Sequence, residues 1–187
     1  MKQARGRRGP TDRERPARLA QAALSVATER GLGELSHRAV AERASVPLGS
    51  TTYHYTDRHD LLAAGMREAV IECRVAVDDW SRTLNRDNVI RKLAEWIHSQ
   101  VAPGMARDRL LLWFEFSVMA VRFDDLKLVN HDWDSILPDA LRPHVGPELA
   151  DECNVATNGL LFNILMHDLS PSRSEIEDRL TKWLVRD

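Results

Sequence analysis

Residues 36–61 read SHRAVAERASVPLGSTTYHYTDRHDL. Ser36 is a residue type that caps helices, and Pro47 suits the start of a second short helix. Val40 and Ala41 are small and apolar, so the two helices can cross closely. Two short helices joined by a tight turn and braced on a longer preceding helix form a helix-turn-helix. The stretch therefore predicts this motif.

A longer helix is predicted immediately before this stretch. Thr11 and Glu14 have the spacing of a capping box, and apolar residues recur at helical spacing up to Ala27. Gly31 is a suitable residue for the end of this helix. Residues 1–10, MKQARGRRGP, are rich in Gly and Arg, and we expect them to form a flexible basic arm.

The rest of the chain keeps a helical period and shows no sustained alternation typical of strands. A long helix capped by Thr56 or Asp57 is expected next, followed by helices over 88–101, 108–123, 126–137 and 148–168, and a last one capped by Ser172 or Ser174. We expect Pro138 to end one helix, and Pro143 and Pro147 to bracket a loop. The predicted fold is all-α, with a three-helix helix-turn-helix domain, a C-terminal helical bundle and about nine helices in all.

Charge is unevenly distributed, although the formal net charge is only −2. Residues 1–62 contain 11 Lys and Arg against 7 Asp and Glu, a net +4 that leaves −6 for the rest. A basic module attached to an acidic body is typical of phosphate binding. The alternative is that the asymmetry comes from the arm, because without residues 1–10 the first third is neutral.

Composition restricts the class of protein further. Hydrophobic residues make up 43% and charged residues 29%, which indicates a folded chain. No apolar run reaches the roughly 18 residues of a membrane span, and the N-terminus lacks the apolar segment of a secretory signal. We therefore expect a cytoplasmic protein with no membrane partner. Cys73 and Cys153 lack CxxC spacing and are expected to be reduced and mostly buried, with a redox-sensing thiol as the alternative.

The N-terminal third resembles the DNA-binding domain of the tetracycline-repressor (TetR) family. The resemblance runs without a gap and rests on Ala22, Ala23, Gly31, Ser36, Val40, Ala41, Ala44, Ser45, Val46, Gly49, Ser50, Thr51, Tyr53, His54, Tyr55, Arg58 and Leu61. The chain departs from the family pattern at four positions. Thr52 replaces a phosphate-contacting Tyr, Tyr55 a Phe, Arg58 a Lys, and Pro47 a Ser.

The resemblance implies contacts to double-stranded DNA carrying a palindromic operator. Arg38 is expected to reach a base, typically guanine, with phosphate contact as the alternative. The predicted DNA-binding residues are Ser36, His37, Arg38, Leu48, Gly49, Ser50, Thr52, Tyr53, His54 and Arg58. The basic arm would reach a minor groove.

The resemblance also implies a ligand cavity in the body. The predicted lining residues are Trp96, Trp113, Glu115, Phe116, Met119, Asn158 and Phe162. Core packing is the alternative explanation for the aromatic residues, whereas Glu115 and Asn158 are the preferred polar groups. The implied domains are the arm at 1–10, the helix-turn-helix domain at 11–56, and a ligand-binding and dimerisation domain at 57–187.

A homodimer is expected on the same basis. The last two long helices would pair with their copies through Val155, Gly159, Phe162, Ile176, Leu180 and Trp183, unless these residues pack only within the chain. Dimerisation would set two recognition helices about 34 Å apart, the spacing of successive major grooves.

The implied function is a repressor released from its operator by a small molecule of unknown identity. The alternatives are control by a protein partner, or a ligand that acts as co-repressor or activator. An enzyme is not expected: the sequence has no P-loop or GxSxG motif, and the groups His131, Asp132, Asp134 and His167, Asp168 lack a second set of ligands. We expect no metal and no cofactor.

Overall fold

The computed structural model describes residues 14–184, and every regular element in that range is a helix, which confirms the all-α prediction. The elements are α1 (Arg15–Arg30), η1 (Leu32–Glu34), α2 (His37–Arg43), α3 (Leu48–His54), α4 (Arg58–Ser81), α5 (Val89–Val101), α6 (Met105–Ala120), α7 (Asp124–Asp134), α8 (Ile136–Val145), α9 (Pro147–Met166) and α10 (Arg173–Leu184). Within residues 14–184, no helix has the length and apolar character needed to cross a membrane. The predicted arm and Thr11 lie outside the described residues.

The helix ends near the N-terminus follow the local sequence signals. The Ser36 hydroxyl accepts a hydrogen bond from the Ala39 backbone N–H at 3.2 Å, which caps α2. The Asp57 carboxylate accepts one from the Asp60 N–H at 3.0 Å and caps α4. Gly31 ends α1 with a φ of 82°, a conformation that side chains with a Cβ rarely adopt. These three predictions are confirmed.

The helix predicted from Leu126 is confirmed as far as Asp134, but the rest of the prediction for residues 126–147 is wrong. Pro138 does not end a helix but lies in the first turn of α8, where its missing N–H would have no intrahelical acceptor. Pro143 lies inside α8, and Pro147 begins α9 directly after Gly146. The predicted loop is therefore absent, and α7 and α8 are separate helices.

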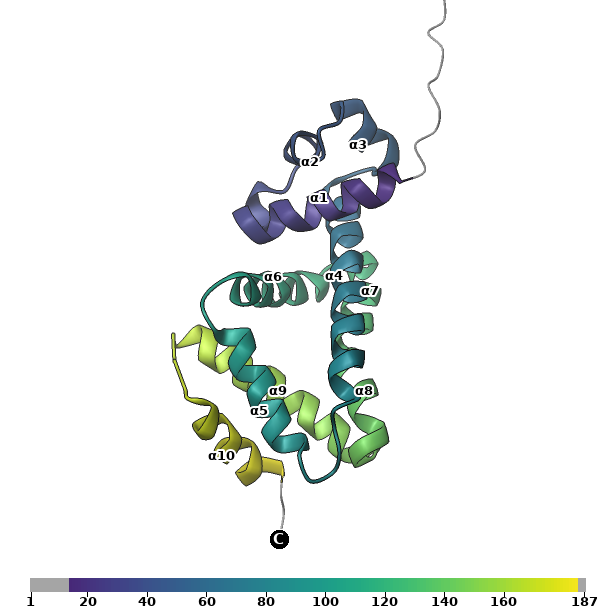
Figure 1. Ribbon diagram of the computed structural model, residues 1–187. Helices are drawn as coiled ribbons and strands as arrows, with labels where there is room; N and C mark the ends of the chain where they lie inside the picture. The colour runs from purple at the N-terminus through teal and green to yellow at the C-terminus, as the bar shows by residue number, and fades with distance from the viewer. Residues whose placement is uncertain (1–13, 185–187) are drawn as a thin grey trace, which may run out of the picture.

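Helices α1 to α3 form a headpiece at one end of the molecule, and α4 runs from it along the side of the body (Figure 1). One buried apolar cluster joins the headpiece to the body, because it contains Leu19 of α1, Leu61 of α4, Phe116 of α6 and Leu126 of α7. A second cluster lies among α5, α8, α9 and α10. The first cluster crosses position 56/57, where the sequence predicts a domain boundary.

Helix α4 crosses α1 at Gly65, where the two backbones are very close. A Cβ at this position would lie 2.8 Å from the Leu24 nitrogen and 3.3 Å from the Ala20 carbonyl oxygen. Real Cβ atoms essentially never come so near to backbone atoms. Only glycine allows this crossing, and the crossing determines how the headpiece sits on the body.

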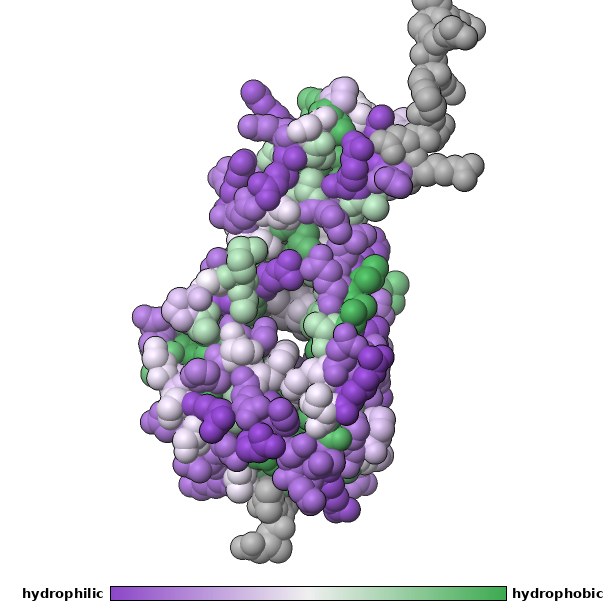
Figure 2. Space-filling view, in the orientation of Figure 1, coloured by the Kyte–Doolittle hydropathy of each residue, from purple (hydrophilic) through white to green (hydrophobic). Residues whose placement is uncertain are grey.

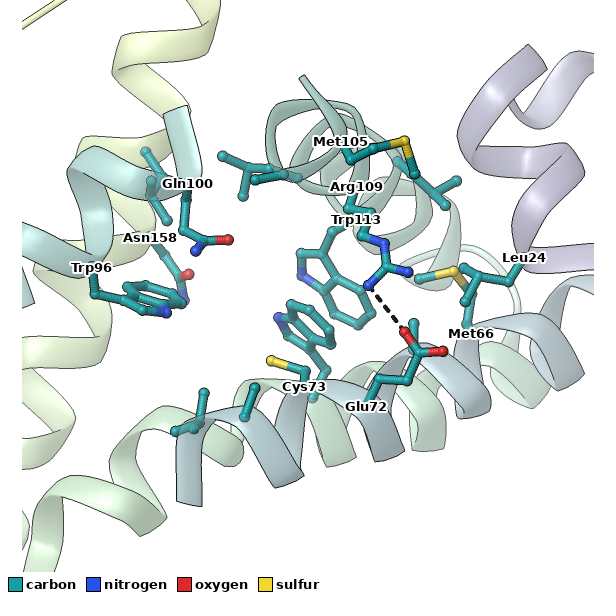
Figure 3. Close-up of a pocket in the computed structure, with 18 residues that line it drawn as sticks. Leu24, Met66, Glu72, Cys73, Trp96, Gln100, Met105, Arg109, Trp113 and Asn158 are labelled. Atoms are coloured by element: carbon teal, nitrogen blue, oxygen red, sulfur yellow. Dashed lines mark ion pairs between the residues drawn. The ribbon is translucent and has the colours of Figure 1, made fainter. Parts of the chain in front are cut away.

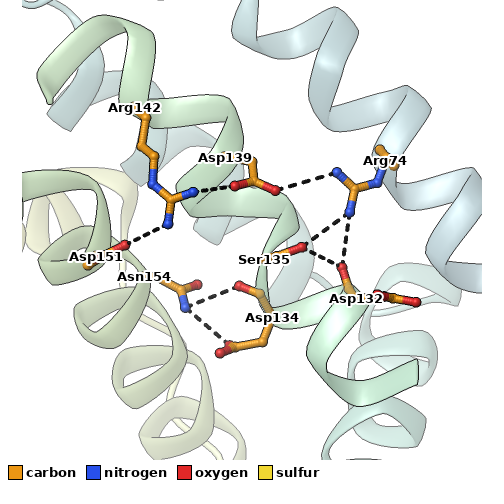
Figure 4. Close-up of polar contacts among 8 residues, drawn as sticks. All are labelled: Arg74, Asp132, Asp134, Ser135, Asp139, Arg142, Asp151 and Asn154. Carbon is orange, nitrogen blue, oxygen red and sulfur yellow. Dashed lines mark hydrogen bonds and ion pairs between the residues drawn. The ribbon is translucent and has the colours of Figure 1, made fainter. Parts of the chain in front are cut away.

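The far half of α4 is held by charged side chains (Figure 4). The Arg74 guanidinium donates to Ser135 Oγ at 3.2 Å and lies 3.7 Å from the Asp139 carboxylate of α8. Arg142 of α8 also pairs with Asp139, and it pairs with Asp151 of α9 at 3.2 Å. Helix α4 is thus connected to α8, and through α8 to α9.

We predict that Gly65→Ala lowers the free energy of unfolding by about 1–3 kcal/mol, because the added methyl group forces α1 and α4 apart. Urea unfolding followed by circular dichroism measures the change. Gly33→Ala in η1 is the matched control, since no atom lies within 4 Å of its built Cβ and its φ is not in the left-handed region. Equal stability of Gly65→Ala and wild type would contradict the close crossing.

Candidate functional site

The residues predicted to bind DNA gather on the outer face of the headpiece. Tyr53 is 83% exposed and Leu48 is 51% exposed, both on α3. Arg38 on α2 and Gly49 and Thr52 on α3 are exposed as well. Large side chains exposed in this way are available to a partner, and a Cβ at Gly49 would meet open space.

Other predicted residues on this face have structural contacts of their own. His37, Ser50 and His54 are half-buried. The His54 ring lies edge-on to Tyr53 with centroids 5.0 Å apart, and Arg58 donates a hydrogen bond to the Leu32 carbonyl. Tyr55, which replaces the usual Phe, donates its hydroxyl to the Pro16 carbonyl at 3.0 Å and so ties α3 to α1.

A pocket of about 490 Å³ lies in the body below the headpiece, where Figure 2 shows the molecule hollowed. Its volume falls within the usual range for small-molecule sites, about 300–1,000 Å³. The lining comes from α4, α5, α6, α7 and α9, together with Leu24 of α1. The headpiece therefore contributes one side chain directly to the wall of the pocket.

Three tryptophans supply the flat walls (Figure 3). Trp113 of α6 and Trp133 of α7 stack with centroids 4.0 Å apart and planes 17° from parallel. Trp96 of α5 lies across the pocket from Trp113. Met66 and Met105 add flexible apolar surface at the headpiece end. These walls suit a flat apolar ligand.

Polar groups lie at the two ends of the pocket (Figure 3). At the headpiece end, Glu72 of α4 and Arg109 of α6 form an ion pair at 3.0 Å, so their charges neutralise each other. At the other end, Gln100 and Asn158 present amides. Burial raises the pKa of the Cys73 thiol to about 11, so this wall residue is an uncharged thiol at neutral pH.

Some of the residues predicted to line a ligand cavity border this pocket, and others do not. Trp96, Trp113 and Asn158 line the pocket, whereas Glu115, Phe116, Met119 and Phe162 do not. Glu115 is exposed, Met119 is half-buried, and Phe116 is fully buried in the core. Phe162 is 46% exposed and packs against Phe114 with centroids 5.4 Å apart. Helix α6 carries apolar side chains on nearly all of its faces. The sequence therefore could not indicate which face lines the pocket.

The prediction missed most of the α4 wall. Met66, Ala69, Cys73 and Ala76 recur every three or four residues and all line the pocket. Their spacing marks one face of a helix, and the alanines on it leave space beside the larger side chains. This helical spacing of large side chains and alanines was the signal in the sequence that could have identified the α4 wall. The pairing of Glu72 with Arg109 had no comparable signal, because it joins separate helices.

The predicted dimer residues divide into two groups. Val155, Phe162 and Trp183 are exposed, at 73%, 46% and 48%, and Gly159 faces open space. Ile176 and Leu180 are fully buried in the second core cluster instead. These two residues therefore pack within the chain and are not available to a second copy.

The His and Asp groups considered for metal binding are not assembled into a site. Within residues 14–184, no three His, Cys, Asp or Glu side chains lie close enough together to hold a metal ion. The Asp134 carboxylate accepts hydrogen bonds from the side-chain amides of Asn154 and Asn158, at 3.1 and 3.2 Å. It therefore serves to link α7 to α9.

Comparison with known proteins gives matches among solved structures. No protein-family model and no curated protein matches the chain. A putative transcriptional regulator from Streptomyces coelicolor A3(2) is 27% identical, with a TM-score of 0.78 over 92% of this chain and 99% of that one. The multidrug binding protein EbrR complexed with ethidium is 28% identical, with a TM-score of 0.80 over the same shares.

A third solved structure carries the family name. A member of the TetR family from Streptomyces coelicolor A3 is 27% identical, with a TM-score of 0.71 over 92% of this chain and 99% of that one. The likeness extends over the headpiece and the body together, and the helix-turn-helix residues lie where the sequence predicts them. The chain is therefore similar in fold and in sequence to TetR-family transcriptional regulators.

Proposed function

We propose that the chain is a homodimeric repressor in the cytoplasm that leaves a palindromic operator when a small molecule occupies the pocket. The observation that carries this proposal is the position of Leu24, which belongs to α1 of the headpiece and also lines the pocket. The similar protein EbrR is a multidrug binding protein whose structure is a complex with ethidium. Ligand binding by that protein supports a ligand-responsive role for the pocket in this chain.

The crossing of α1 and α4 provides a route from the pocket to the headpiece. Leu24 touches the pocket with its side chain and meets Gly65 with its backbone nitrogen. Met66, the next residue on α4, is also a wall residue. An occupant that presses on Leu24 or Met66 therefore acts on the contact that orients the headpiece.

Charged residues offer a second route. A smaller cavity of about 100 Å³ separates the Glu72–Arg109 pair from α1, and Glu29 of α1 lines it. Glu29 in turn pairs with Arg43 of α2 at 2.5 Å. A ligand group that entered this small cavity would therefore contact both the Glu72–Arg109 pair and Glu29, the partner of Arg43 on α2.

The expected mechanism is a shift between two dimer populations. One population holds its recognition helices about 34 Å apart, at the spacing of successive major grooves. A ligand that binds better to the other population draws the dimer away from DNA, in proportion to its difference in affinity for the two. The proposal needs no covalent step.

The exposed face of α9 and α10 is the proposed contact with a second copy. Val155, Phe162, Met166 and Trp183 leave large apolar groups exposed there. Gly159 lies on the same helix with open space around it, so another helix can approach closely. Two copies related by a two-fold axis would bury this face in a four-helix bundle.

We predict that Arg38→Ala weakens binding to an operator, selected from random duplex DNA, by roughly tenfold, since it removes a base contact. Fluorescence anisotropy at fixed salt measures the affinity. Arg86→Ala is the control, because Arg86 is an exposed arginine between α4 and α5, away from the headpiece. If Arg38→Ala and Gly49→Trp both bind as tightly as wild type, the helix-turn-helix does not contact DNA.

We predict that the wild-type chain is a dimer and that Phe162→Glu makes it a monomer, because a charge would be buried in the α9 contact. Light scattering coupled to size exclusion reports the mass. Leu128→Glu on α7 is the matched control, since Leu128 is 74% exposed and lies outside the proposed interface. A wild-type monomer, or a Phe162→Glu dimer, would refute the interface.

A further inference from the structure

A second, much smaller cavity adjoins the pocket, and we call it the side chamber. Its volume is about 30 Å³, close to the volume that one molecule occupies in liquid water. It shares with the pocket the wall residues Cys73, Val77, Trp96, Trp133 and Asn158, and it is also lined by Asp134, Ile136, Leu137, Asn154 and Thr157. A single small polar group fits there, and a ring does not.

The Thr157 side chain is the unusual member of this wall. Thr157 is 1% exposed, and none of the residues that the structure describes forms a hydrogen bond with its hydroxyl. Burying a hydroxyl without a partner is unfavourable, so a group that supplies one gains binding free energy. The hydroxyl can donate one hydrogen bond and accept others.

The neighbouring amide offers a complementary acceptor. Asn158 Nδ2 donates to Asp134 Oδ1 at 3.2 Å, which orients the amide and occupies its nitrogen. Asn154 Nδ2 donates to the same carboxylate oxygen at 3.1 Å (Figure 4). The carbonyl oxygen of Asn158 is the remaining acceptor of that side chain. Thr157 and Asn158, which carry this donor and this acceptor, are neighbouring residues that both line the small chamber.

The two cavities differ in how their charged groups are compensated. Glu72 and Arg109 neutralise each other at the headpiece end, whereas the Asp134 carboxylate keeps its negative charge and accepts hydrogen bonds from two neutral amides. An uncharged ligand leaves these interactions intact, whereas an anionic group in the side chamber would be repelled by the Asp134 carboxylate. Trp96 and Trp133 border both cavities, so a ring lying against them has its edge at the side chamber.

We propose that the effector is a flat aromatic compound with a neutral hydroxyl group, and that this hydroxyl occupies the side chamber. The hydroxyl accepts a hydrogen bond from Thr157 Oγ1 and donates one to Asn158 Oδ1, while the ring lies against Trp96 and Trp133. A carbonyl oxygen could only accept and would leave Asn158 Oδ1 without a donor, whereas a hydroxyl matches both groups. This inference rests on the proposed function, because it names the ligand class of the same pocket.

Equilibrium dialysis of the full chain with 2-naphthol and with naphthalene tests the proposal. We expect Thr157→Val, which has the same shape without the hydroxyl, to weaken 2-naphthol binding about fivefold, the effect of one hydrogen bond. Naphthalene should bind Thr157→Val at least as tightly as wild type. Thr157→Ser is the matched control, because it keeps the hydroxyl and should keep the preference for 2-naphthol.

Thermal unfolding without ligand gives an independent measurement. We expect Thr157→Val to unfold at the same temperature as wild type or higher, because it removes an unpaired buried hydroxyl. A lower unfolding temperature would show that the hydroxyl has a partner in the protein, which overturns the proposal. Undetectable binding of 2-naphthol to wild type, or equal affinity of wild type and Thr157→Val for it, overturns the proposal too. These experiments do not measure operator binding, so they test the ligand class alone. The proposed function fails separately, if the wild-type chain binds no selected DNA.

Discussion

The close crossing of α1 and α4 at Gly65 is the contact on which the arrangement of the molecule depends. The Leu24 nitrogen lies where any Cβ at position 65 would be only 2.8 Å away, so the two helices are packed backbone to backbone. Packed contacts of this kind have few alternative geometries and transmit displacement instead of absorbing it. The crossing therefore fixes the headpiece relative to α4, and it also sets the Leu24 side chain in the pocket wall.

Helix α4 links the wall of the pocket to the headpiece. One of its faces lines the pocket with Met66, Ala69 and Cys73, and its first turn is capped by Asp57, three residues after the end of α3. Beyond the pocket, Arg74 holds α4 against α8. Because α4 is attached at both ends and lines the pocket between them, the proposed ligand would act on the helix that orients the headpiece.

The sequence predicts the headpiece well because its signals are local. Ser36 and Asp57 cap their helices through residues three positions away, so a short window of sequence contains the whole interaction. Pro138 misled the prediction because a proline is compatible with the first turn of a helix as well as with the end of one. The position of Pro138 therefore depended on which of these two locally allowed structures the neighbouring helices favoured.

The pocket was harder to predict, because its residues meet through tertiary packing. The rotation of α6, which is apolar on most sides, decides that Trp113 faces the pocket while Glu115 faces solvent. Ile176 and Leu180 have the periodicity of an interface but are covered by the chain's own second cluster. In the sequence, Thr157 looks like any other residue of a helix. Its hydroxyl lacks a hydrogen-bond partner because of how α9 packs beside α7 and α8, which the sequence does not reveal.

The most direct test of coupling between pocket and headpiece is the affinity of the full chain for its selected operator, measured with and without a saturating concentration of the tightest-binding hydroxylated ring compound. We expect the ligand to weaken operator binding by about 5- to 150-fold, the usual range of coupling between two sites. Reciprocity requires that the operator weaken ligand binding by the same factor. An operator Kd that stays unchanged while dialysis shows the pocket to be saturated would contradict this coupling.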